Sequence, residues 1–175
     1  MPEHIEDYLA ALEEREGTVR KVLDNRTIHE PIRLLNPRTP LSVPSSATLR
    51  EATDVMREHH IGCVLVVDAG RLVGILTERD LLLKMESADL SEPVSGFMTR
   101  DPETLEPDDP IVWALNRMSV GGYRHVPLVD REGVPVGILS VKDIVHYIVA
   151  LFPNEVLTLP PDPLRADAAP GRDGG

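Results

Sequence analysis

The feature of this sequence that most constrains its fold is an internal repeat. Residues 38–80 align with residues 100–143, displaced by 62 positions at the start and by 63 at the end. The most similar part reads Gly-Ile-Leu-Thr-Glu-Arg-Asp at 74–80 and Gly-Ile-Leu-Ser-Val-Lys-Asp at 137–143. The one-residue difference follows Asp68, where an insertion costs little if the chain makes a hairpin turn. A duplication of this kind implies two copies of one structural unit.

Each copy has the pattern of a β-α-β-β-α unit. A short extended segment, at 41–43 and at 104–105, precedes polar and proline residues that can start a helix. Apolar residues at helical spacing follow, and then two Val- and Leu-rich strands around a glycine-containing turn. The predicted helix starts are Ser45-Ser46 and Thr77 in the first copy, and Asp109-Pro110 and Ser140 in the second. One such unit is too small to bury its sheet and helices alone, so we expect an α+β fold with the two units packed sheet against sheet.

The regions outside the repeat differ from it in composition. Residues 3–24 place their apolar side chains on one helical face, which predicts an amphipathic helix that packs on its own core or forms a dimer contact. Residues 153–175 are rich in proline and acids and predict an extended or disordered tail. The expected organisation is a helical extension at 1–35, repeats at 36–92 and 93–152, and a tail at 153–175.

Composition limits the classes of function. Asp and Glu number 29 against 18 Lys and Arg, a formal net charge of −11, which argues against binding a nucleic acid polymer or an anionic membrane. The longest apolar stretch, 147–152, is much shorter than the ~20 residues of a membrane-spanning helix. The first 16 residues lack a signal-peptide pattern, and the single cysteine, Cys63, forms no internal disulfide. We therefore expect a cytoplasmic protein.

The residues with the clearest chemistry are Thr77 with Asp80, and Ser140 with Asp143, where a strand is predicted to end and a helix to begin. A hydroxyl followed three residues later by an acid is a capping-box pattern. The same arrangement suits a nucleotide, because a helix N-terminus offers N–H groups to phosphate and a carboxylate one turn later accepts ribose hydroxyls. The two roles are compatible, and recurrence in both copies favours binding.

In these residues, and in Arg-His-Val-Pro-Leu-Val-Asp at 124–130, the chain resembles the cystathionine-β-synthase-type (CBS) domain family. Its domains occur in tandem pairs called Bateman modules, and the resemblance covers about residues 36–150. It implies two β-α-β-β-α units packed through their sheets about a pseudo-two-fold axis. It also implies two clefts for adenosine-containing ligands such as AMP, ADP, ATP or S-adenosylmethionine, and assembly into a homodimer.

The resemblance also implies roles for single residues. Asp80 and Asp143 match the family's ribose-binding acids, while the segments around Ser42 and Thr104 match the edge that frames the adenine. Thr77 and Ser140 match its phosphate-binding hydroxyls, and the basic pair at 124–125, just before Val126, matches a pair that in some members reaches phosphate. The implied ligand-binding residues are Thr77, Arg79, Asp80, Thr104, Arg124, His125, Val126, Ser140, Lys142 and Asp143. The first copy lacks the basic residue and the proline of 124–127, so the second site is expected to be the more complete.

Other side chains give weaker signals. His59, His60 and His146 have no carboxylate or cysteine at a recognised metal spacing, so no metal is expected. No nucleophile with its base, no Gly-rich phosphate loop and no catalytic carboxylate pair is evident, which makes an enzyme the least supported class. Two functions remain. One is a regulatory module that senses an adenine nucleotide and acts through dimer geometry or an effector protein. The alternative is a structural dimerisation or protein-interaction module with vestigial clefts.

Overall fold

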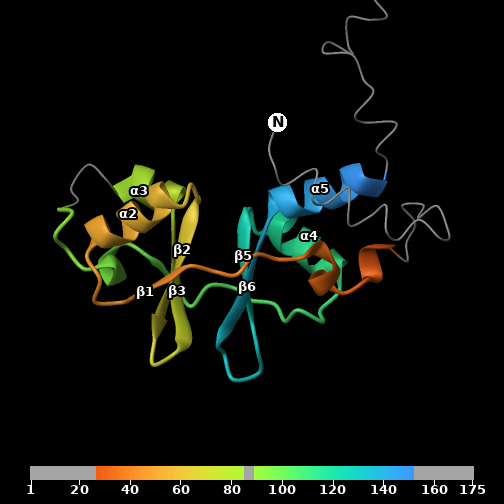
Figure 1. The fold of residues 1–175 in the computed structure, drawn as a ribbon, viewed down its shortest axis with the longest axis horizontal. Coiled ribbons are helices and arrows are strands. Elements are labelled where there is room, and N and C mark those ends of the chain that lie inside the picture. The colour runs from red at the N-terminus through yellow and green to blue at the C-terminus, as the bar shows by residue number, and fades with distance from the viewer. Residues whose placement is uncertain (1–26, 85–88, 152–175) are drawn as a thin grey trace, which may run out of the picture.

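The computed structural model describes residues 27–84 and 89–151. The helix predicted at 3–24 and the tail predicted at 153–175 lie outside the described residues. Within them, the chain forms two α+β units that face each other through their strands, with the helices on the outer side of each (Figure 1). The predicted fold class is confirmed.

The first unit is built around a four-stranded sheet in the order β1-β2-β3-β4. β1 pairs parallel with β2, and the other pairs are antiparallel. The elements are β1 (Ser42–Pro44), α2 (Leu49–Glu58), β2 (Cys63–Asp68), β3 (Arg71–Thr77), α3 (Glu78–Lys84) and β4 (Thr99–Arg100). The prediction that Ser45 and Ser46 start the first helix is wrong. Thr48 is the N-cap, in a reciprocal capping box with Glu51, whereas the Ser45 N–H donates to Asp68 at 3.1 Å.

The second unit repeats this arrangement with fewer strands. Its elements are α4 (Ile111–Val120), β5 (His125–Val129), β6 (Pro135–Ser140) and α5 (Val141–Leu151). β5 and β6 form an antiparallel hairpin. The extended segment predicted at 104–105 makes a single parallel bridge, between Leu105 and Leu128, instead of a full strand.

Each unit has its own aliphatic core, and each core is completed by a short 3-10 segment. The first core includes Val94, from η4 (Val94–Gly96), and the second includes Ile32 and Leu35, from η2 (Ile32–Leu35). A third cluster joins the two sheets, where Cys63, Leu65 and Ile75 pack with Leu72 and Ile138. The sheet-to-sheet contact predicted from the size of one unit is therefore apolar.

The segment before the first unit is attached to the second. The N–H of Ile32 donates to the carbonyl of Asp109, and the N–H of Ile111 donates to the carbonyl of Glu30, both at 2.9 Å. From there the orange chain in Figure 1 crosses to β1 and runs past β6, where the Ile138 N–H donates to the Arg38 carbonyl at 3.0 Å. This crossing places residues 38–41 between the two units. Among the described helices, none has the length and apolar character needed to cross a membrane.

Candidate functional site

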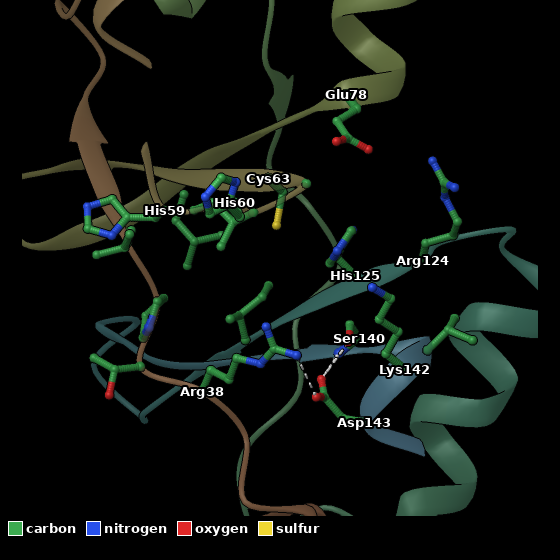
Figure 2. A pocket seen from close by; sticks show the side chains of 18 residues that line it. Arg38, His59, His60, Cys63, Glu78, Arg124, His125, Ser140, Lys142 and Asp143 are labelled. Atoms are coloured by element: carbon green, nitrogen blue, oxygen red, sulfur yellow. Dashed lines mark hydrogen bonds and ion pairs between the residues drawn. The ribbon is translucent and has the colours of Figure 1, made fainter. Parts of the chain in front are cut away.

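A cavity of about 710 Å³ opens between the two units and is lined by residues of both. Its walls come from the crossing segment, the loop before β2, the start of α3, and the ends of β5 and β6 (Figure 2). Its charged and polar side chains include Arg38, Glu78, Arg124, His125, Ser140, Lys142 and Asp143. The structure thus brings together five of the predicted site residues, which are Arg124, His125, Ser140, Lys142 and Asp143.

Asp143 holds the start of α5 with one carboxylate oxygen and leaves the other toward the cavity. The Ser140 N–H and hydroxyl both donate to Asp143 Oδ2 at 2.6 Å. Asp143 Oδ1 lies 3.5 Å from Arg38 Nη2. Of the predicted capping box, the bonds from Ser140 to the Asp143 carboxylate are present, and they are compatible with a free lone pair on Oδ1 for a ligand hydroxyl.

Positive charge gathers at one end of the cavity. Arg124 and Lys142 are exposed and form no ion pair within the described residues. Burial lowers the pKa of His125, and the nearby Arg124 and Arg38 charges lower it further, while Asp143 and Glu78 partly oppose them. His125 is therefore a neutral imidazole at neutral pH, with one donor and one acceptor nitrogen. These groups suit an anion that accepts hydrogen bonds.

Part of the cavity lining is apolar. Pro40 and Leu41 of the crossing segment, Ile61 before β2, Leu65 of β2 and Ile138 of β6 line it. The Leu65 N–H donates to the Leu41 carbonyl at 2.9 Å, which fixes the crossing segment against β2. An aliphatic wall with backbone polar groups at its edge is suited to a flat heteroaromatic ring.

Cys63 also lines the cavity, but it is not a reactive group. It begins β2 and is 7% exposed, as expected for a small apolar residue at the start of a buried strand. Burial, and secondarily the charge of Glu78, raise the pKa of its thiol to about 12. The side chain is a protonated thiol at neutral pH and not a nucleophile.

The equivalent motif of the first repeat makes the same bonds to its acid, and its hydroxyl also accepts the Asp80 N–H at 3.3 Å, but its surroundings differ. The Thr77 N–H and hydroxyl donate to Asp80 Oδ2 at 3.0 and 2.6 Å. Asp80 Oδ1 accepts the Thr99 hydroxyl at 3.2 Å and lies 3.8 Å from Lys84 Nζ. Both oxygens of Asp80 therefore have protein partners, and neither Thr77 nor Asp80 lines the large cavity.

The remaining predicted residues also lie elsewhere. Arg79 is exposed and does not line the large cavity. Thr104 lines a smaller cavity of about 220 Å³ near the two hairpin turns, and Val126 is a core residue with 1% exposure. The extended segment that lines the large cavity is 38–41, just before β1, and not the one around Thr104.

Two charged residues that line the cavity together with Asp143, Arg38 and Glu78, were not predicted as site residues. Arg38 opens the repeated segment at the same position as Arg100, and Glu78 lies inside the Thr77–Asp80 motif. Both positions lie in the repeated part of the sequence. The repeat alone does not indicate that these two residues of the first copy line a cavity with Ser140 and Asp143 of the second. His59 and His60 line the cavity edge as well, and the described residues hold no cluster of three or more side chains suited to a metal ion.

Comparison with known proteins identifies the family. The model described as the CBS domain matches twice, at residues 33–87 and 94–150. The chain belongs to the CBS domain family. The two matches coincide with the two repeats, so the protein carries a tandem CBS pair, as the sequence motifs predicted.

Relatives support this assignment over the repeats. A 17.7 kDa protein of Acidianus ambivalens is 34% identical over 108 residues, which cover 61% of this chain and 66% of that protein. Longer curated relatives are matched over only 21–22% of their length. The chain thus spans just under two thirds of the first relative and about a fifth of these longer ones.

Two solved structures are similar in fold and sequence. The CBS domain pair of protein MJ0100, in complex with 5′-methylthioadenosine and S-adenosyl-L-methionine, has a TM-score of 0.63 and 27% identity, covering 67% of this chain and 98% of that one. A CBS domain protein from Pyrobaculum aerophilum complexed with AMP has a TM-score of 0.61 and 30% identity, covering 65% and 88%.

Proposed function

We propose that this chain is a cytoplasmic regulatory module that binds an adenosine-containing nucleotide, of the AMP, ADP or ATP class, in the cavity between its two CBS repeats. One observation carries the proposal: a single cavity is lined by the Asp143 carboxylate, by cations that form no ion pair among the described residues, and by aliphatic side chains. The similar structures that hold AMP or S-adenosyl-L-methionine support it. The binding residues we assign are Arg38, Arg124, His125, Ser140, Lys142 and Asp143.

Each part of a nucleotide has a matching group. Ribose hydroxyls donate to Asp143 Oδ1, whose position is fixed by the bonds of Oδ2 to Ser140. The phosphate lies near Arg124, Lys142 and the N-terminus of α5, where the helix dipole favours an anion, although the Val141 N–H itself donates to the Arg124 carbonyl. The base packs on the wall that includes Ile61 and Ile138.

Binding would stabilise one arrangement of the two repeats, because the cavity takes its walls from both. A ligand shifts a conformational equilibrium by the difference of its affinity for the two states. A homodimer partner or an effector protein would respond to that arrangement. The groups at the cavity bind rather than react: the Cys63 thiol is protonated, so we assign no catalytic role.

The test is calorimetric titration of the full chain with AMP, ADP, ATP and S-adenosylmethionine. Asp143→Asn should weaken the binding of the preferred ligand by at least about tenfold, because the ribose loses an ionised acceptor. Asp80→Asn is the matched control, since Asp80 makes the same cap outside the cavity, and it should change affinity less than twofold. Equal binding by wild type and Asp143→Asn would show that the site is elsewhere.

The structural alternative has one observation in its favour. Val141, Val145 and Ile148 form an apolar stripe on the exposed side of α5, with 40%, 48% and 38% of their surfaces accessible. Such a stripe suits a helix contact in a dimer. If the wild type is a dimer in sedimentation analysis and binds none of the four ligands at millimolar concentration, the dimerisation module is the better description.

A further inference from the structure

Glu78 is the first residue of α3 in the first repeat, yet it lines the cavity that contains Ser140 and Asp143 of the second. Its N–H donates to the Gly62 carbonyl at 3.0 Å, which fixes the start of α3 beside the loop before β2. A Cβ placed on Gly62 would lie 3.4 Å from both Glu78 Oε2 and His125 Cε1. The Glu78 carboxylate and the His125 imidazole therefore approach each other over the same glycine.

The charges at this end of the cavity are unevenly matched. Arg38 is paired with Asp143, which leaves Arg124, Lys142 and Glu78 without an ion pair among the described residues. Figure 2 shows Glu78 and Arg124 beyond His125 when seen from Ser140 and Asp143. Two cations and one carboxylate thus face the space into which a phosphate chain would extend.

On the basis of the proposed function, we infer that Glu78 makes this cavity selective for a nucleoside monophosphate over a triphosphate. A first phosphate lies near Lys142 and the start of α5, at a distance from Glu78. Each further phosphate adds about one negative charge and must extend toward the Glu78 carboxylate. Repulsion between like charges in a partly enclosed site is stronger than in water, so the cost rises with chain length.

The influence of Glu78 on its neighbours supports this assignment. Its charge raises the pKa of the Cys63 thiol and opposes the lowering of the His125 pKa. Both of those side chains line the cavity. The field of the carboxylate therefore extends through the space between Cys63 and His125.

The test compares AMP and ATP affinities by calorimetry, in buffer with EDTA so that no divalent cation bridges Glu78 and a phosphate. The wild type should bind AMP more tightly than ATP. Glu78→Gln should strengthen ATP binding about five- to tenfold and AMP binding by no more than about twofold. Glu78→Asp, which keeps the charge, should retain the preference for AMP.

Glu132→Gln is the matched control. Glu132 is exposed in the turn between β5 and β6, outside the cavity, and its loss changes the net charge of the protein by the same amount. It should leave the ratio of the two affinities unchanged. A wild type that binds ATP as tightly as AMP, or a ratio that Glu78→Gln does not alter, overturns the inference and leaves the proposed function intact. If the wild type binds neither AMP nor ATP, the proposed function and this inference are both overturned.

Discussion

Asp80 and Asp143 occupy the same position in the two repeats, but only Asp143 lines the large cavity. Four residues after Asp80, Lys84 pairs with it, and the Lys84 ammonium also donates to the Phe97 carbonyl. The equivalent of Lys84 in the second repeat is Tyr147, whose hydroxyl donates to Glu30 at 2.7 Å. The residue four positions after the acid therefore pairs with it in the first repeat and bonds to Glu30 in the second.

A second pair of equivalent residues strengthens the contrast. Arg38 approaches Asp143, whereas Arg100 donates to the Ser95 carbonyl at 2.9 Å and not to Asp80. A hydroxyl from Thr99 also reaches Asp80, and the equivalent position before the first repeat is Pro37, which has none. The comparison teaches that a motif shared by two repeats identifies two helix starts, and that residues outside the motif determine the surroundings of each acid.

The largest expected effect is on the free energy of unfolding, and it tests whether the cores of the two repeats are equally well packed. Leu76 and Leu139 are equivalent core residues, each with 0% exposure. Leu76→Ala and Leu139→Ala should each lower the free energy of unfolding by about 2–5 kcal/mol, because each leaves a cavity in an aliphatic core. Chemical denaturation measures both. A nearly neutral result for either one would show that the two cores are not equally well packed.

A smaller loss of stability should distinguish the two repeats when a glycine in the second strand of each hairpin, β3 or β6, is replaced by alanine. A Cβ on Gly74 would lie 2.3 Å from Met98 Sδ, whereas a Cβ on the equivalent Gly137 would lie 3.1 Å from Leu128 Cδ1. Gly74→Ala should therefore destabilise the protein by about 1–3 kcal/mol through overpacking, and Gly137→Ala by less. Thermal unfolding compares the two variants. The opposite order would show that Met98 moves aside more easily than Leu128.

The arginine pair tests the contrast at the cleft itself. Arg38→Gln should weaken AMP binding about tenfold, or about 1.4 kcal/mol, because Arg38 lines the cavity and holds Asp143. Arg100→Gln should leave AMP affinity unchanged, since Arg100 bonds to Ser95. Calorimetric titration gives both values. Similar losses in the two variants would contradict the assignment of the ligand to the cleft of the second repeat.

The smallest effect concerns His125, whose position in the first repeat is occupied by Cys63. Since the pKa of His125 is lowered in the folded protein, the unfolded chain binds this proton more readily, and stability falls as pH drops below about 6.5. Between pH 7.5 and 5, the melting temperature of the wild type should fall more than that of His125→Gln, by about one degree. An equal fall in both proteins would show that His125 does not contribute to the pH dependence.

The sequence predicted the fold because the duplication, the period of its apolar residues and the turn residues all indicate the same unit. It also predicted residues that the structure brings to one cavity, including Ser140, Asp143 and the basic pair at 124–125. It did not predict that Arg38 and Glu78 join them, because this depends on how one repeat packs on the other. The first helix start was misplaced for a local reason: Ser45 and Thr48 are both acceptable N-caps, and only Thr48 has a glutamate three residues later.

The attachment of residues 27–35 to the second repeat has a consequence for the order of folding. The core of the first repeat is contained in residues 43–98, so it is complete soon after that stretch has been synthesised. The core of the second repeat requires Ile32 and Leu35 together with Leu139, Ile144 and Tyr147, more than 100 residues later in the chain. Contacts between such distant residues form slowly because a long loop must close first. During synthesis, Ile32 and Leu35 therefore cannot complete the core of the second repeat until the chain has been made as far as Tyr147.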